Sequence, residues 1–537
     1  MVGFARKFYR YAMVSGLAVL STGVIAASPA QAQVTAFKQA VAEAASRDDA
    51  LSAFYRENGF QPVWTVDSPI GVERRSALLR ALRDADQHGL PVKRYNFDAL
   101  YAQLGDADTP RELGLAEVAM SDAFLTYAKD VQSGMFKPSS LDNDIKRKAP
   151  VRDRRENLET FLDSDPSAFI KTLPPTTSQY VGLMKEKKRL EHVIDLGGWG
   201  PTVQAKKLKP GDSGKAVVAL RNRLITLGYL ERSAAITFDT EMQKAVQAFQ
   251  LANGLEADGV AGSGTIAEIN RPPQERLKSI MVAMERERWL NKERGERHVL
   301  VNLTDFTARI IDHDAVTFET RSVVGKNQSD RRSPEFSDVM EHMVINPTWN
   351  VPRSIATKEY LPMLKRNPNA VSYLKLVNSR GQVVNRGNVN FSQFTARNFP
   401  FDIKQAPGSR NALGLVKFMF PNKYNIYLHD TPAKNLFSRE VRAYSHGCIR
   451  LHQPFDFAYA LLARQVDNPK EYFQTRLKTG RETTVDLIQD IPVHIIYRTA
   501  FSDAKGHMNY RRDIYGRDAK IWKAMANEGV ALDAVQG

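Results

Sequence analysis

The chain has 537 residues, and it must contain several domains because single hydrophobic cores stop growing at about 250 to 300 residues. Its 43% hydrophobic and 25% charged residues are typical of globular proteins, which excludes a chain too polar to bury a core. Lys and Arg outnumber Asp and Glu by 75 to 60, so the net charge of +15 favours an anionic partner such as nucleic acid, membrane headgroups or an acidic polymer, unless it serves only solubility.

The first 32 residues have the pattern of a secretory signal that is removed on export. Basic residues lie between Arg6 and Arg10, an apolar stretch runs from Ala12 to Ala27, and the small residues Ala30-Gln31-Ala32 follow. The apolar stretch is shorter than the roughly 20 residues of a spanning helix, and an uncleaved anchor is the alternative. We therefore expect a periplasmic protein that associates peripherally with the cell envelope and does not bind nucleic acid.

Residues 34–200 are predicted to form a helical domain. Apolar residues recur at spacings of three and four in the stretches Val34 to Phe54, Arg75 to His88 and Leu115 to Ser133, as on one buried helix face. Proline-containing joints at 137–138 and 174–175 separate the helices. No catalytic group of residues stands out here, which indicates a scaffold.

Residues 208–271 are predicted to form a small domain of three helices. The turn-rich segment 208–214 precedes an apolar helix face that ends at Gly228, a usual position after a helix C-terminus. A second apolar face contains Met242, Val246 and Phe249, and a further turn leads to Ile266. In order and spacing this segment resembles the peptidoglycan-binding domain of bacterial wall enzymes. The alternative is a spacer that binds nothing.

A charged linker helix over 274–292 is expected to lead into a domain of a different kind. From Arg297 apolar residues alternate, which is typical of strands, and helical segments interrupt this pattern at 354–364 and 455–466. We interpret residues 297–500 as a mainly β domain and 501–537 as a C-terminal extension. The fold class is therefore multidomain α+β.

Cys448 is the only cysteine of the chain and lies in the run Ser445-His446-Gly447-Cys448-Ile449-Arg450. In an oxidising compartment, cysteines normally form disulfides, and an unpaired thiol is exposed to damage. Its retention beside histidine and glycine indicates nucleophilic chemistry. The alternative is a small buried hydrophobic residue.

A thiol of ordinary pKa needs a base to become a nucleophile, and two histidines are candidates. In the predicted strand Tyr424–His429, alternation places Tyr427 and His429 on one face. A histidine on a neighbouring strand can face the sulfur, whereas His446 is only two residues away in a tight loop. We therefore favour His429 as base, oriented by the backbone carbonyl or the carboxylate of Asp430.

Other residues near Cys448 have candidate roles. The N–H groups of Gly447 and Cys448 are suited to an oxyanion hole, and Arg450 is suited to a substrate carboxylate or to a salt bridge within the loop. A metal site is a further alternative, although its spacing matches no usual zinc pattern. That site would be made from His429, His446, Cys448 and His452.

Several segments together resemble the L,D-transpeptidase family, and in particular its large Gram-negative subgroup. The resemblance covers nearly the whole chain after the signal. The matching segments are Ile426 to Pro432, Ser445 to Leu451, Asn346 to Pro352, Pro407 to Gly414, Lys417-Phe418 and Asp513 to Asp518.

The resemblance implies a mechanism and a substrate. Members attack the bond between the third residue of a tetrapeptide stem, usually meso-diaminopimelate, and the terminal D-alanine, and form a cysteine thioester. The amine of a second stem resolves it and gives a 3-3 cross-link. Cys448 would be the nucleophile, His429 the proton acceptor and donor, and His446 with Gly447 would shape the oxyanion site. Arg450, Tyr427 and Asn411 are then candidate substrate-binding residues.

The family pattern leaves alternatives open. Many relatives have glycine where this chain has Asp430, which leaves the group that orients His429 undecided. Residues from about 355 to 404 resemble a lid that would exclude water and favour transfer over hydrolysis. A carboxypeptidase or endopeptidase using the same thioester, and an inactive wall-binding scaffold, are the competing functions. A papain-like protease lacks its local signature, and no glycine-rich phosphate loop or dinucleotide fingerprint appears, so no cofactor is inferred.

Overall fold

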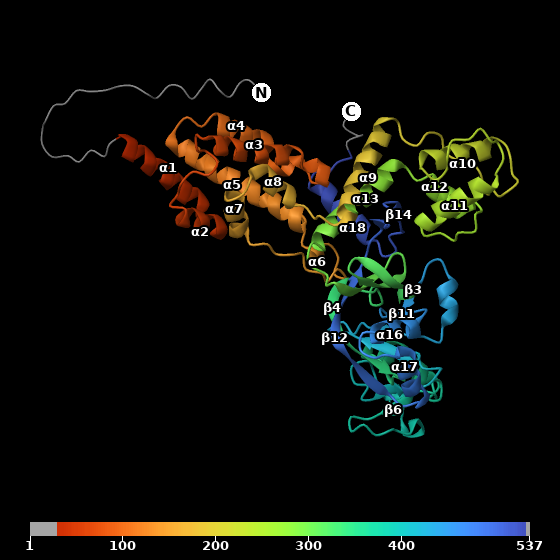
Figure 1. Ribbon diagram of the computed structural model, residues 1–537. Coiled ribbons are helices and arrows are strands. Elements are labelled where there is room, and N and C mark those ends of the chain that lie inside the picture. The colour runs from red at the N-terminus through yellow and green to blue at the C-terminus, as the bar shows by residue number, and fades with distance from the viewer. Residues whose placement is uncertain (1–28, 533–537) are drawn as a thin grey trace, which may run out of the picture. The chain divides into compact units, whose positions relative to one another are not determined.

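The computed structural model describes residues 29 to 532, which form two compact units (Figure 1). The first contains the described residues up to Val72 and Asp98–Asp122, and the second contains Glu73–Phe97 and the chain from Ala123 onward. The predicted signal lies outside the described residues except for its last four, which begin helix α1. Within the described range, no helix is long and apolar enough to cross a membrane.

Helices make up the N-terminal region, as predicted. The stretch Val34 to Phe54 is divided between two of them, because the Asp48 side chain accepts hydrogen bonds from the N–H groups of Ala50 and Leu51 and so starts a new helix. The helices are α1 (Pro29–Ala45), α2 (Asp49–Glu57), α3 (Pro69–Arg83), α4 (Phe97–Gly105), α5 (Pro110–Ser133), α6 (Pro138–Leu141), α7 (Arg154–Leu162), α8 (Pro166–Thr172) and α9 (Ser178–Asp195), with 3-10 turns η1 (Ala85–His88) and η2 (Val92–Tyr95).

A buried carboxylate organises the first unit. Glu117 of α5 is fully buried and accepts hydrogen bonds from the backbone N–H groups of Val63, Trp64 and Thr65 at 2.8 to 3.0 Å. The Tyr55 hydroxyl donates to the same carboxylate at 2.9 Å. The loop after α2 has no regular ladder for these donors, so Glu117 takes the place of backbone partners.

The three-helix domain has the predicted elements, α10 (Lys215–Thr226), α11 (Thr240–Ala252) and α12 (Ser263–Ile269). Gly228 follows α10 with φ +80°, a left-handed conformation that glycine adopts without strain. The Asp239 carboxylate caps α11 by accepting from the N–H of Met242. Val217, Leu220, Leu224, Met242, Val246, Phe249 and Ile266 are among the buried residues of its core.

Helix α13 (Pro273–Trp289) differs from the charged linker that the sequence suggests, because most of its charged residues are buried. Arg286 lies 2.8 Å from both Glu335 and Asp518, and Arg498 lies 2.6 Å from Glu287. A buried charge is tolerated when it is paired, and removing one partner is costly. The helix therefore ties together segments that are distant in sequence.

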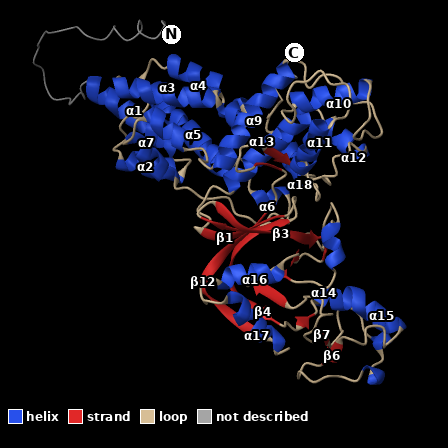
Figure 2. Ribbon diagram, turned by 45° about the vertical axis from the view of Figure 1, so that its right-hand side comes forward, coloured by secondary structure: helices blue, strands red, loops and turns tan. Residues whose placement is uncertain are grey.

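The domain after α13 is a nine-stranded sheet in the order β10-β3-β11-β9-β8-β4-β12-β1-β2, and β2 also pairs with β3, so the sheet closes into a barrel (Figure 2). Helices α16 (Pro454–Leu462) and α17 (Pro469–Lys478) pack on it. The strands are β1 (Arg297–Asn302), β2 (Thr307–Asp312), β3 (Ala315–Gly325), β4 (Phe336–Ile345), β8 (Val416–Met419), β9 (Leu428–His429), β10 (Ala443–Ser445), β11 (Ile449–Leu451) and β12 (Thr483–Ile496).

The predicted lid is a substructure with a hydrophobic core of its own. That core includes Ile355, Leu364, Phe391 and Ile403. The predicted helical insertion also contains a three-stranded sheet in the order β5-β7-β6. Its elements are β5 (Trp349–Asn350), α14 (Arg353–Ile355), the π-helix η3 (Ala356–Tyr360), α15 (Leu361–Arg366), β6 (Lys375–Val377), the 3-10 turns η4 (Arg386–Asn388) and η5 (Phe391–Gln393), and β7 (Asp402–Gln405).

The C-terminal segment returns to α13. It contains the hairpin β13 (Ala500–Ser502) and β14 (Met508–Tyr510), and its helix α18 (Arg517–Asn527) is the last described element. The remaining 3-10 turn, η6 (Lys434–Ser438), belongs to the barrel domain. The fully buried Arg517 of α18 lies 3.0 Å from Glu335. The extension is thus part of the buried charge network.

Candidate active site

The candidate catalytic residues lie on one face of three neighbouring strands. Arg450 of β11 is directly opposite His429 of β9, and Lys417 of β8 is opposite His429 on the other side. The alternate residues Phe418, Leu428 and Ile449 point into the barrel core. The predicted alternation around His429 is therefore confirmed, although the strand itself begins at Leu428 because Asn425 has φ +55°.

Cys448 precedes β11, on the same side as Arg450. Although part of the residue is exposed, burial of the thiol raises its pKa to about 11, against the opposing effects of Tyr427 and Arg450. The Sγ–H group donates to the backbone carbonyl of Asn425 at 3.4 Å. The thiol of this candidate nucleophile is thus neutral at pH 7, and it would need a proton acceptor to react as a thiolate.

His429 is only 4% exposed, and its neutral form is strongly favoured. Burial, followed by the charge of Arg450, lowers its pKa to about 3. Nδ1 lies 2.5 Å from the carbonyl oxygen of Asp430, which can only accept, so Nδ1 carries the proton and donates it. Nε2 is then the basic nitrogen.

The backbone carbonyl of Asp430 therefore orients the imidazole, and the carboxylate has another task. Its oxygens accept from the N–H groups of Leu415 and Thr431 at 2.9 and 2.7 Å and from the Lys434 ammonium at 2.6 Å. These bonds fix the loop that carries the carbonyl.

No hydrogen bond joins the Cys448 sulfur to His429 anywhere in the described chain, since the thiol faces Asn425. Catalytic hydrogen bonds are often long or misaligned in unliganded enzymes and tighten with substrate.

The glycine before the nucleophile is held in a conformation that other residues avoid. Gly447 has φ +119°, and a Cβ there would lie 3.1 Å from Ile426 Cδ1. Its carbonyl accepts from the Ser333 hydroxyl at 2.6 Å, and its N–H donates to the Ser445 hydroxyl at 3.1 Å. The N–H of Cys448 has no partner among residues 29–532, so it is the available donor for an oxyanion.

His446 contacts the lid. Its Nε2 lies 2.8 Å from the Glu359 carboxylate of η3, which also accepts from the Arg331 guanidinium at 2.9 Å. Next to this cluster, Lys358 pairs with Asp330 at 2.8 Å. Two ion-pair contacts therefore connect the π-helix of the lid with the loops that surround Cys448.

The three candidate substrate-binding residues have different surroundings. The guanidinium of Arg450 forms no hydrogen bond or ion pair within the described residues, and its Nε is buried without a partner. The backbone and hydroxyl of Tyr427 interact with the Cys448 thiol. Asn411 is 1% exposed, its amide donates to the carbonyls of Pro347 and Ala406, and its Oδ1 accepts from Leu413, so it holds a loop and has no free polar atom for a substrate.

The residues considered for a metal site do not converge. Within the described part of the chain, no three His, Cys, Asp or Glu side chains are placed to hold one ion. His446 pairs with Glu359, and the His452 ring packs on Phe437 at 5.0 Å.

Residues 296–485 match the family model of the L,D-transpeptidase catalytic domain. This segment is therefore similar to the catalytic domain of that family. Residues 49–186 match the model described as a scaffold domain, and residues 213–269 match the model described as "Putative peptidoglycan binding domain". The helical front, the small domain and the barrel are thus the three parts that the sequence resemblance predicted.

A curated protein of Haemophilus influenzae named "Putative L,D-transpeptidase" is 31% identical over 231 residues, which are 43% of this chain and 46% of that protein. The chain thus matches less than half of the relative's length. Crystal structures of L,D-transpeptidases from Xylanimonas cellulosilytica and Stackebrandtia nassauensis are 15% and 16% identical and cover 55% of this chain. The alignments include 98% and 96% of the two crystallised chains, and the TM-scores are 0.17 and 0.21.

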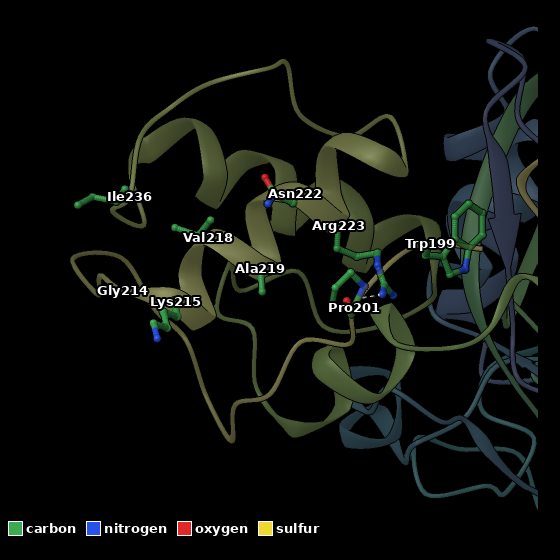
Figure 3. Close-up of a pocket in the computed structure, with 9 residues that line it drawn as sticks. All are labelled: Trp199, Pro201, Gly214, Lys215, Val218, Ala219, Asn222, Arg223 and Ile236. Carbon is green, nitrogen blue, oxygen red and sulfur yellow. Dashed lines mark hydrogen bonds between the residues drawn. The ribbon is translucent and has the colours of Figure 1, made fainter. Parts of the chain in front are cut away.

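A separate cavity of about 470 Å³ is lined by residues of the three-helix domain and of the segment before it (Figure 3). Its wall is mostly apolar and includes Val218 and Ala219 of α10. Lys215 and Ile236 lie toward one side of the view, and Trp199 and Arg223 lie toward the other. The Arg223 guanidinium donates to the carbonyl of Pro201 at 2.8 Å, which holds this wall in place.

Three residues of the candidate active site were not singled out by sequence reasoning. Glu359 and Arg331 are distant from Cys448 in sequence and carry no local signal. Lys417 appears in the sequence only as part of a matching segment, but Val416 and Phe418 are apolar, and this alternation places Lys417 on the face of His429.

Proposed function

We propose that this protein is a periplasmic enzyme that forms 3-3 cross-links in peptidoglycan through a thioester on Cys448. The observation that carries the proposal is a buried imidazole on the strand next to β11, which follows Cys448, whose Nδ1 is fixed by Asp430, so that Nε2 is basic beside a neutral thiol. The unpartnered Arg450 beside them supplies a charge for a substrate carboxylate.

In the first half of the reaction, the Cys448 sulfur attacks the carbonyl carbon of the third stem residue, and its proton passes to Nε2 of His429. The oxyanion that forms accepts a hydrogen bond from the backbone N–H of Cys448. The carbon–nitrogen bond to D-alanine then breaks. The leaving amine takes the proton from His429, and the third residue remains as a thioester.

In the second half, the side-chain amine of another stem attacks the thioester. His429 accepts a proton from this amine, the carbon–sulfur bond breaks, and the proton returns to the departing sulfur. Water in place of the amine would give a tripeptide, which is the product of a carboxypeptidase. The acceptor therefore decides between the two activities.

The additional domains support a wall substrate. The peptidoglycan-binding domain would hold the glycan, and its apolar cavity next to Trp199 is suited to a sugar or peptide segment. The net charge of +15 favours the acidic wall polymer.

The direct test is to incubate the purified protein with disaccharide-tetrapeptide and to identify the products by mass spectrometry. We expect a cross-linked dimer that has lost one D-alanine. Tripeptide monomer without dimer would assign a carboxypeptidase instead. No release of D-alanine would reject both enzymes and leave a wall-binding scaffold.

A second prediction concerns the lid. Glu359→Gln removes the charge that binds His446 and Arg331, and because exposed ion pairs contribute about 0.2 to 1 kcal/mol each, we expect the ratio of hydrolysed to cross-linked product to rise about two- to tenfold. D-Alanine release should change little. The ratio is measured by chromatography of both products. Asp402→Asn, another exposed lid carboxylate, is the control and should keep the parent ratio. An unchanged ratio with Glu359→Gln would show that this cluster does not close the lid.

A further inference from the structure

A row of three basic side chains crosses the active face of the barrel. In the sheet, β8 and β11 lie on either side of β9, and Lys417, His429 and Arg450 are register neighbours. Directly opposite residues on one face of a sheet interact with each other. Two cations therefore flank the candidate base.

Neither cation has a partner of its own. Within the described residues, no hydrogen bond or ion pair engages the Lys417 ammonium or the Arg450 guanidinium. The nearest acidic influence on Lys417 is Glu482, an exposed residue whose carboxylate accepts from the Thr348 N–H. Burial lowers the pKa of Lys417, with Glu482 acting in the opposite sense. Partly buried charges without counterions are expected where a ligand supplies the opposite charge.

The two cations lie at different distances from the nucleophile. Arg450 is two residues after Cys448 in the chain, about 7 Å in backbone terms. Lys417 lies two strand spacings beyond Arg450, about 10 Å, and is therefore farther from Cys448 than Arg450 is. A tetrapeptide stem with meso-diaminopimelate also has two carboxylates at different distances. The D-alanine carboxylate is two atoms from the scissile carbonyl, and the carboxylate at the far end of diaminopimelate is five carbons away.

We propose that Lys417 binds the side-chain carboxylate of the third stem residue, while Arg450 binds the terminal D-alanine carboxylate. This assignment rests on the proposed function and adds a source of substrate specificity to it. Lys417 would select a donor stem whose third residue has an acidic end over one that carries an amide there.

The test uses two donor stems that differ only in this group, disaccharide-tetrapeptide with free meso-diaminopimelate and the same compound with its side-chain carboxylate amidated. The measured quantity is kcat/KM for D-alanine release. We expect the parent protein to prefer the acid stem by about 10- to 100-fold, because a hydrogen bond to a charged group is lost with the amide. Lys417→Met should lower kcat/KM for the acid stem by that factor and leave the amide stem within about twofold.

Three variants serve as controls. Lys417→Arg keeps the charge and should retain most of the preference. Lys470→Met removes an exposed lysine of the same domain and should behave as the parent. Glu482→Gln removes the acidic group that acts on Lys417, and the preference should persist in this variant because Lys417 binds the substrate carboxylate directly.

The outcomes separate this assignment from the function on which it rests. If the parent releases D-alanine from neither stem, the proposed function itself fails. Two results would show that Lys417 does not bind the side-chain carboxylate. One is equal D-alanine release by the parent from both stems, and the other is an equal decrease in kcat/KM for both stems in Lys417→Met at an unchanged melting temperature. If Lys417→Met lowers the melting temperature, Lys417→Gln takes its place, and the same two results decide.

Discussion

Replacing Cys448 with alanine is expected to lower the rate of D-alanine release by at least about 10⁴-fold, because covalent catalysis disappears with the only thiol of the chain. The parent protein mixed with tetrapeptide should gain the mass of the acyl group in intact-protein mass spectrometry, and the variant should gain none. The side chain is small and partly exposed, so the change should leave the fold intact.

A chemical control is available because the chain has one cysteine. Alkylation with iodoacetamide should reduce the parent to the activity of the variant and should leave the variant unmodified. An alanine variant that still released D-alanine at the parent rate would exclude the thioester mechanism.

Replacing His429 with glutamine is expected to slow acylation by about 10² to 10⁴-fold, the usual contribution of a general base. Glutamine can donate to the Asp430 carbonyl as the imidazole does, but it cannot accept a proton at neutral pH. Acylation is measured as the first turnover of D-alanine release in a rapid-quench experiment. The control is His507→Gln, a histidine with a 73% exposed side chain in the C-terminal segment.

The pH dependence of the acylation rate is a second test of His429 as the general base. The pKa of His429 is lowered to about 3 and that of Cys448 is raised to about 11, so both groups are neutral between these values. The acylation rate of the parent should therefore be flat from about pH 5 to 9, and should fall only as acid protonates His429 near the lower value. A rate that rose steeply from pH 5 to 7 would instead contradict the assignment of His429 as the base.

The parts that sequence reasoning predicted are those with a strong local pattern. The three-helix domain has apolar residues at helical spacing. In the strand, alternation placed the side chains of Tyr427 and His429 on one face of the sheet and that of Leu428 on the other. Both patterns reflect burial of one face, which depends on neighbours in the sequence.

The parts that it did not predict depend on contacts between distant segments. The run Glu285 to Arg288 is typical of a solvated helix face, but its partners Glu335, Arg498 and Asp518 are supplied by other parts of the chain. The role of Asn411 in holding its loop and the contact of Glu359 with His446 likewise follow only from the fold.

The charge network around α13 also determines which segments have to stay together. The match to the catalytic-domain family ends at residue 485, inside β12, although β12 pairs with both β4 and β1 beyond that point. A fragment of residues 296–485 would lack part of β12, so its barrel would be open, and the buried Glu335 carboxylate would lose its partners Arg286 and Arg517. The partners of this network therefore come together only in a chain that runs at least from the start of α13 to the end of α18.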